Sequence, residues 1–92
     1  MNPKVSILMG IYNCEKTLRY TLDSIIGQTY ENWEVIMCDD GSQDRTYEIA
    51  MEYAAKDKRF TVIRNSENYG LAVTLNRCLK LARGEYVMRQ DG

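Results

Sequence analysis

Residues 5–11 read Val-Ser-Ile-Leu-Met-Gly-Ile, and this almost unbroken apolar run decides the fold. Such density is typical of a strand in a parallel sheet that is covered on both faces, because a half-exposed strand alternates apolar with polar residues. Working outward, shorter runs lie at Trp33 to Cys38, Phe60 to Ile63 and Glu85 to Met88. The sequence therefore predicts four strands, with the first at the centre of the sheet.

Helical patterns fill the intervals between these strands. Asn13 can cap the first helix, Ser42 or Asp44 the second, and Gly84 can end the third. The apolar stripes that define the helices are Leu18, Leu22, Ile25 and Ile26, then Ile49, Ala50, Tyr53 and Ala54, and finally Leu71, Leu75, Cys78, Leu79 and Ala82. This alternation predicts a three-layer α/β/α, Rossmann-like parallel sheet, whose ligands bind at the carboxyl ends of the strands.

Length, charge and cysteine content limit the number of domains, the kinds of binding partner and the state of the cysteines. The 92 residues suffice for one small domain, and a net charge of −1 offers no general attraction for nucleic acid or an anionic membrane. No leader or bilayer-spanning run opens the sequence, so we expect a cytoplasmic protein. Cys14, Cys38 and Cys78 are odd in number, widely spaced and unaccompanied by histidine, which favours reduced packing residues over a disulfide framework or a zinc site.

The loop after the first strand has no standard phosphate-binding motif. Neither GxGxxG nor GxxxxGK[ST] occurs, which removes the main support for a dinucleotide or P-loop site. The loop can instead offer the backbone of Gly10 and Ile11 and the ring of Tyr12 to a base or ribose. The alternative is that Tyr12 only packs against the end of its strand.

Asp39 and Asp40 follow the second strand directly, at the edge where ligands are expected. A carboxylate there can accept hydrogen bonds from ribose hydroxyls or from the imide N–H of uracil. The alternative is turn chemistry, since Asp-Gly-Ser is a common turn and acidic residues suit a helix start without any ligand.

Further candidate ligand-binding residues lie after the third and fourth strands. Asn68 and Asn76 could hold a ligand through their amides, and Gly70 lets the backbone pass close to it. Asn76 falls in the middle of a predicted helix, where asparagine is unfavourable unless its amide has a partner. Asp91 supplies one carboxylate for a divalent metal. Taken singly, each is equally compatible with a cap, a solvent-facing amide or a surface charge.

Short segments along the whole chain share the pattern of one enzyme family. They are Val5-Ser6-Ile7-Leu8-Met9 with Tyr12-Asn13, Gln28-Thr29-Tyr30, Trp33-Glu34-Val35-Ile36, Asp39-Asp40-Gly41-Ser42-Gln43-Asp44 with Thr46, Arg64-Asn65, Asn68-Tyr69-Gly70-Leu71-Ala72, Leu75-Asn76 and Ala82-Arg83-Gly84-Glu85-Tyr86-Val87. In this order they resemble the family 2 inverting glycosyltransferases.

The resemblance implies a GT-A fold that binds a sugar nucleotide, with UDP-sugars as the expected donors. By position, Asp40 would contact the base, Tyr12 would lie beside it and Asp39 would support the ribose. Asp91 matches the first aspartate of a DXD motif, which holds Mn²⁺ or Mg²⁺ on the donor diphosphate in this family. Gly10 and Ile11 depart from the Pro-Thr that many relatives have.

The third position of DXD would follow Gly92, and the general base of such enzymes lies further downstream. We therefore expect residues 1–92 to form a partial GT-A domain that carries the donor site, contains no catalytic residue and is inactive alone. The implied reaction is in-line displacement at the anomeric carbon with inversion, onto a glycan or lipid-linked acceptor hydroxyl. The alternatives are a nucleotidyltransferase or dehydrogenase on a similar sheet, or a module that binds nucleotide without turnover.

Overall fold

The computed structural model describes residues 2–92 and contains a parallel four-stranded sheet. The elements follow one another as β1 (Val5–Ile11), α1 (Leu18–Ile26), β2 (Trp33–Asp39), α2 (Thr46–Lys56), β3 (Phe60–Arg64), α3 (Leu71–Leu81) and β4 (Tyr86–Arg89). The spatial order is β3-β2-β1-β4, and every pairing is parallel. The predicted order of strands and helices is confirmed, and β1 has the predicted bounds.

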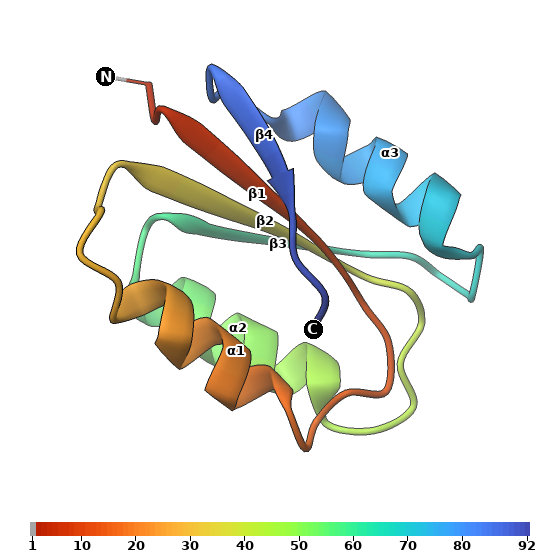
Figure 1. Cartoon of the computed structure of the whole chain (residues 1–92). Coiled ribbons are helices and arrows are strands. Elements are labelled where there is room, and N and C mark those ends of the chain that lie inside the picture. The colour runs from red at the N-terminus through yellow and green to blue at the C-terminus, as the bar shows by residue number, and fades with distance from the viewer. Residues whose placement is uncertain (1) are drawn as a thin grey trace.

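Helices cover both faces of the sheet, which confirms the three-layer arrangement. Helices α1 and α2 lie on one face and α3 on the other (Figure 1). The apolar run of β1 divides between these faces because successive side chains of a strand point in opposite directions. Ile7, Met9 and Ile11 belong to the larger core cluster with α1 and α2, whereas Leu8 packs with Cys78 of α3.

One end of each helix differs from the expectation. Helix α2 begins at Thr46 with Arg45, not Ser42 or Asp44, at its N-cap position, although Asp44 Oδ1 accepts a hydrogen bond from Thr46 N at 2.9 Å. Helix α1 begins at Leu18, and Asn13 does not cap it; Asn13 has a φ of 46°, and its Oδ1 accepts a hydrogen bond from Gln43 N at 2.9 Å. Asn13 thus joins the turn after β1 to the turn after β2. Helix α3 ends at Leu81, before Gly84. A Cβ at Gly84 would lie 2.6 Å from Ser6 N, so this glycine is needed for close packing against β1.

The cysteines behave as the sequence predicts. Cys14, Cys38 and Cys78 are free thiols, and the latter two are buried on the α3 face. Burial raises the pKa of Cys78 to about 12. Within residues 2–92, no helix combines the length and apolar character that crossing a bilayer requires.

Candidate functional site

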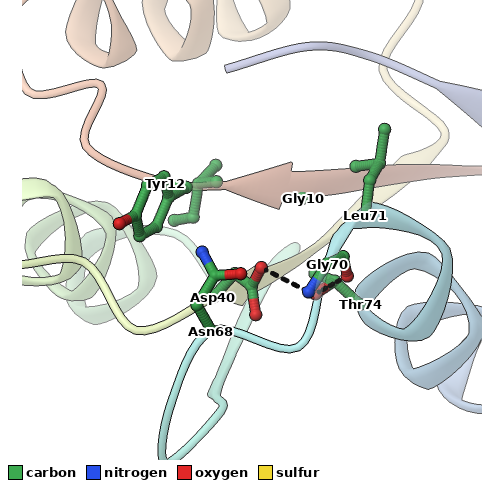
Figure 2. A pocket seen from close by; sticks show the side chains of 8 residues that line it. Gly10, Tyr12, Asp40, Asn68, Gly70, Leu71 and Thr74 are labelled. Carbon is green, nitrogen blue, oxygen red and sulfur yellow. Dashed lines mark hydrogen bonds between the residues drawn. The ribbon is translucent and has the colours of Figure 1, made fainter.

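A pocket of about 250 Å³ opens at the carboxyl ends of β1 and β2, beside the start of α3. Figure 2 shows side chains from the three segments facing it. Its lining residues are Gly10, Ile11, Tyr12, Asp40, Asn68, Gly70, Leu71 and Thr74. The pocket therefore brings together six residues that the sequence singled out, from three segments far apart in the chain.

The two glycines in the lining are required for different reasons. A Cβ at Gly10 would lie 2.8 Å from Leu71 Cδ1 and 3.3 Å from Thr74 Cγ2, so glycine lets α3 approach β1 closely. At Gly70 nothing would lie within 4 Å of a Cβ, but φ is +93°, in a region that side chains disfavour. Gly70 thereby turns its N–H toward Asp40.

Asp40 is the buried acidic group of the pocket, with 6% of its surface exposed. Its Oδ1 accepts hydrogen bonds from Asn65 Nδ2 and Tyr69 N, both at 2.8 Å, and its Oδ2 accepts one from Gly70 N at 3.0 Å. Burial alone would raise the pKa of Asp40, but these donors together hold the pKa below the usual value for aspartate. Asp40 is therefore an ionised hydrogen-bond acceptor at neutral pH.

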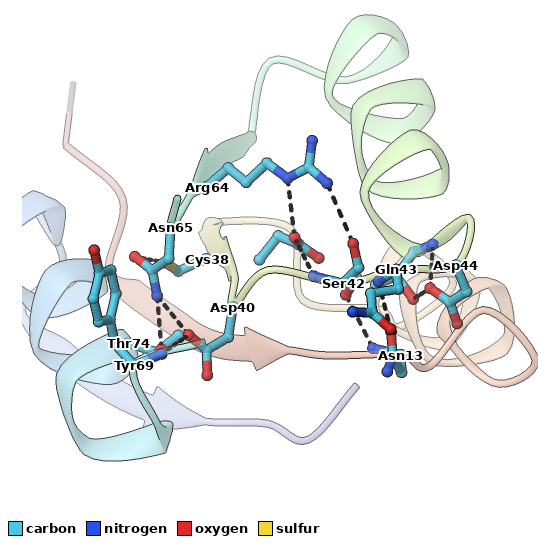
Figure 3. Close-up of polar contacts among 12 residues, drawn as sticks. Asn13, Cys38, Asp40, Ser42, Gln43, Asp44, Arg64, Asn65, Tyr69 and Thr74 are labelled. Carbon is cyan, nitrogen blue, oxygen red and sulfur yellow. Dashed lines mark hydrogen bonds and ion pairs between the residues drawn. The ribbon is translucent and has the colours of Figure 1, made fainter. Parts of the chain in front are cut away.

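Asp39 lies outside the pocket, on the opposite face of the sheet. It is fully buried, accepts a hydrogen bond from Ser42 N at 3.0 Å and pairs with Arg64 Nε at 3.3 Å. In Figure 3, the two partners Arg64 and Ser42 lie apart from Asp40 and its contacts. The physical reason is strand alternation, because neighbouring residues point to opposite faces. The structure thus does not bring Asp39 to the pocket where a ribose contact was expected.

Helix periodicity separates Asn76 from the pocket. Leu71 and Thr74 line the pocket, and they lie three residues apart on one side of α3. Asn76 is exposed and does not line the pocket, because two residues of helix rotate a side chain away from Thr74. The sequence reading missed Thr74, although the Leu71–Thr74–Cys78 spacing could have identified this inward face.

A second missed residue, Asn65, is 1% exposed and bonds both Asp40 and Thr74. Two sequence signals pointed to it: its place directly after β3 and its part in the Arg64-Asn65 segment of the family pattern.

Asp91 lies next to the end of β1 but does not form a metal site. Gln90 N donates to Leu8 O at 3.0 Å, and a Cβ at Gly92 would be 2.9 Å from Ile11 Cγ2, so this segment runs beside β1. The Asp91 side chain is 83% exposed and lies 3.6 Å from Arg89. Residues 2–92 contain no group of three or more histidine, cysteine, aspartate or glutamate side chains that could hold a metal ion. One exposed carboxylate beside an arginine does not fit a divalent cation by itself.

A parallel α/β sheet with a pocket at its carboxyl edge, and a buried acceptor in that pocket, defines the class of Rossmann-like α/β proteins that bind ligands at this edge. Comparison with known sequences gives the particular family. The model of glycosyl transferase family 2 matches residues 6–92. The chain belongs to this family of transferases.

Relatives and solved structures agree with this assignment. A Bacillus subtilis (strain 168) protein named as glycosyltransferase EpsE is 54% identical over 91 residues, 98% of this chain and 33% of the relative. The Escherichia coli UDP-Glc:alpha-D-GlcNAc-diphosphoundecaprenol beta-1,3-glucosyltransferase WfaP is 42% identical over 87 residues, 95% of this chain and 34% of the relative. The chain thus spans about a third of the length of these curated relatives.

Two solved structures are complexes with nucleotide sugars. S. aureus TarS 1-349 with UDP-GlcNAc has a TM-score of 0.88 at 33% identity, covering 96% of this chain and 26% of that one. The mannosyltransferase PcManGT from Pyrobaculum calidifontis, with GDP-Man and Mn²⁺, has a TM-score of 0.88 at 29% identity, covering 99% and 28%. The resemblance to family 2 and the GT-A fold are confirmed.

Proposed function

We propose that the pocket binds the nucleoside end of a nucleotide-sugar donor, with UDP-sugars as the preferred class, in a protein that transfers the sugar to an acceptor hydroxyl. The observation that carries this proposal is the bonding of Asp40. A carboxylate has about four acceptor positions. Three are used by the surrounding chain, two on Oδ1 and one on Oδ2, which leaves one on Oδ2 for a ligand donor. The imide N–H of uracil is such a donor.

The other walls suit a base and a ribose. Tyr12 is 46% exposed and lines the pocket, so its ring offers a surface on which a planar base can stack. Gly10 and Ile11 offer backbone groups, and Asn68 offers an amide beside Asp40. The volume of about 250 Å³ is below the roughly 300–1,000 Å³ of pockets that enclose whole drug-sized ligands. We therefore assign this pocket to the nucleoside and leave the sugar outside it.

Three of the expected donor-binding residues do not line the pocket, and the support for their contact with the donor is weaker: Asp39, Asn76 and Asp91. Asp39 is engaged with Arg64 and Ser42, so its support for a ribose would act through the turn it holds. Asn76 could reach a donor only from outside this pocket. Asp91 lies at the same sheet edge and could supply one ligand to Mn²⁺ or Mg²⁺ on the diphosphate, with the remaining ligands coming from elsewhere.

For the reaction we propose displacement at the anomeric carbon with inversion, in which a carboxylate takes the proton of the acceptor hydroxyl. Asp40 is a poor candidate for this base because hydrogen bonds lower its pKa and hold both of its oxygens. We place the base outside residues 1–92, together with the acceptor site. A glycan or lipid-linked acceptor is supported by the names of relatives such as WfaP. A cytoplasmic location stays a prediction.

The test incubates the full-length protein with UDP- and GDP-sugars, Mn²⁺ or Mg²⁺, and saccharide or lipid-linked acceptors. Product is followed by mass spectrometry, its anomeric configuration by NMR, and donor affinity by calorimetry. We expect UDP-sugar binding and an inverted product. Lys80→Ala serves as a control that leaves binding unchanged, because Lys80 lies in the last turn of α3, away from the pocket at the start of that helix.

Two results would contradict this proposal. Binding without product under every condition would favour the non-catalytic module. Transfer of a nucleotidyl group would favour the nucleotidyltransferase.

A further inference from the structure

Asn65 lies behind the pocket and uses all of its hydrogen-bonding capacity. Its Nδ2 donates to Asp40 Oδ1 at 2.8 Å and to Thr74 Oγ1 at 3.0 Å. Its Oδ1 accepts from Arg77 Nη1 and from Cys38 Sγ, the latter at 3.5 Å. A carboxamide has two N–H donors and two acceptor positions, so no position is left for a ligand.

These contacts close a ring of hydrogen bonds around the back of the pocket. Thr74 Oγ1 donates to Gly70 O at 2.8 Å, and Gly70 N donates to Asp40 Oδ2 at 3.0 Å. Asn65 completes the ring by bonding both Thr74 and Asp40 (Figure 3). The ring joins the end of β2, the end of β3 and the first turn of α3. The direction in which Asp40 Oδ2 points therefore depends on the carboxamide of Asn65.

We propose that Asn65 is a positioning residue for base recognition: it fixes the Asp40 carboxylate so that the free acceptor position of Oδ2 faces the pocket. The inference rests on the proposed function, because it assigns Asn65 to the same nucleoside site. Asn65 itself does not line the pocket.

The charge around Asp40 makes this role measurable by titration. The titratable or charged side chains around it are Cys38 on β2, Tyr12, which lines the same pocket, and Arg77 on α3, which reaches it through Asn65. The Tyr69 phenol bonds Ser66, and the Asp39 carboxylate pairs with Arg64 on the other face of the sheet. Thiols and phenols stay neutral in the acidic range, and arginine stays charged. A pH effect below neutrality in this cluster therefore reports Asp40.

Two substitutions change the ring differently. Asn65→Ala removes the donor to Asp40, which raises the pKa of that carboxyl because a hydrogen bond to the charged form is lost. Asn65→Asp keeps the size and the acceptor for Arg77, but it places a second carboxylate against Asp40, which raises the Asp40 pKa through repulsion between like charges. Ser6→Ala is the matched control, because Ser6 is equally buried but hydrogen-bonds Glu34 at the other end of the sheet.

The experiment uses the full-length protein labelled with ¹⁵N-glycine and ¹⁵N-tyrosine. Without ligand, the amide signals of Gly70 and Tyr69 are followed against pH, since both amides bond Asp40. In parallel, UDP affinity is measured by calorimetry at neutral and acidic pH, and stability by urea unfolding. Both Asn65 variants are expected to move the amide titration to higher pH and to weaken UDP binding about tenfold at neutral pH, with a further loss at a pH where the wild type still binds. Ser6→Ala is expected to lower stability without either effect.

An unchanged amide titration in Asn65→Asp would overturn the inference. So would a loss of affinity that is equal at every pH, because that is the result of a merely structural role. If the wild type binds no nucleotide, the proposed function fails, while the ligand-free titration still decides whether Asn65 positions Asp40.

Discussion

Two buried carboxylates stand at opposite ends of β2 and have opposite surroundings. Glu34, near the start of the strand, is 4% exposed and accepts from Ser6 Oγ at 2.6 Å and Arg83 N at 2.7 Å. The Arg83 guanidinium also donates to it at 3.2 Å. Asp40, just past the other end of β2, is 6% exposed. All the groups that donate hydrogen bonds to it are neutral, namely the Asn65 side chain and the backbone amides of Tyr69 and Gly70.

The difference lies in what each carboxylate can still do. Burial by itself would raise the pKa of Glu34, but Ser6 and Arg83 hold the pKa below its usual value, and a cation compensates its charge. Within residues 2–92, no cation is among the hydrogen-bond partners of the ionised Asp40, since Arg77 reaches it only through Asn65. Asp40 also keeps an acceptor position toward the pocket. The same strand thus carries a carboxylate that joins elements at its amino end and one that can meet a ligand at its carboxyl end.

The first and largest expected effect concerns Asp40. Asp40→Ala removes the acceptor proposed for the base and leaves the Tyr69 and Gly70 amides without their partner. We expect UDP affinity of the full-length protein to fall by about 10- to 100-fold, or about 1.4 to 2.7 kcal/mol, which is the order of a hydrogen bond to a charged group. Calorimetry checks this, and unchanged affinity for UDP and for every other nucleotide tested would remove Asp40 from the base site.

We expect Glu34→Gln to lower the stability of the protein and to leave its UDP affinity unchanged. The amide keeps the shape but loses the charge that Arg83 and Ser6 bond, so we expect a loss of about 1 to 2 kcal/mol in the free energy of unfolding. The expected loss includes little from the ion pair between Arg83 and Glu34, because the Arg83 side chain is 62% exposed and water screens its charge. Urea unfolding measures the loss. If the folded Glu34→Gln variant lost as much UDP affinity as Asp40→Ala, the two carboxylates at the ends of β2 would not have different roles.

Two glycines sharpen the comparison. Gly84→Ala pushes a Cβ into Ser6 at the amino end, and Gly70→Ala strains φ at the pocket without any clash. We expect each to cost about 1 to 2 kcal/mol of stability, with donor affinity falling for Gly70→Ala only. Thermal unfolding and calorimetry on the same samples separate these outcomes. Equal affinity losses in both variants would mean that the two regions are not independent.

The smallest expected effect is on how the free energy of unfolding changes at acidic pH. Both carboxylates have folded-state pKa values below their unfolded values, so their contribution to stability is present above about pH 4 and is lost as the pH falls through the folded values. Glu34→Gln should therefore flatten the decline of unfolding free energy below about pH 4 while the acid dependence of UDP affinity stays that of the wild type. A parallel set of unfolding curves at several pH values checks this, and an unchanged slope in the variant would contradict the role of Glu34.

Much of the fold could be predicted from local pattern. The run at residues 5–11 predicted the bounds of β1 to the residue, because an apolar run this dense and this short is typical of a covered strand. The helix starts were less predictable: Asn13 suits a cap, yet it bonds Gln43 of a distant turn. Position after a strand pointed to Asp40, Asn68 and Gly70, which line the pocket, but it gave Asp39 the same weight. Asn76 was singled out as an amide within a helix, and like Asp39 it does not line the pocket.

By itself, the sequence determined which segments are strands and helices, that the sheet is parallel, and which edge collects the polar loops, since all of these follow from short-range periodicity and chain order. Only the tertiary structure decided that Asp40 faces the pocket while Asp39 faces Arg64, and that Asn65 and Thr74 join the site. Strand alternation predicts that the side chains of neighbouring residues point to opposite faces of the sheet. Which of these faces packs against α3 is set by contacts between residues far apart in the chain. Those long-range contacts also supply the donors that keep a buried carboxylate charged, and no local pattern encodes them.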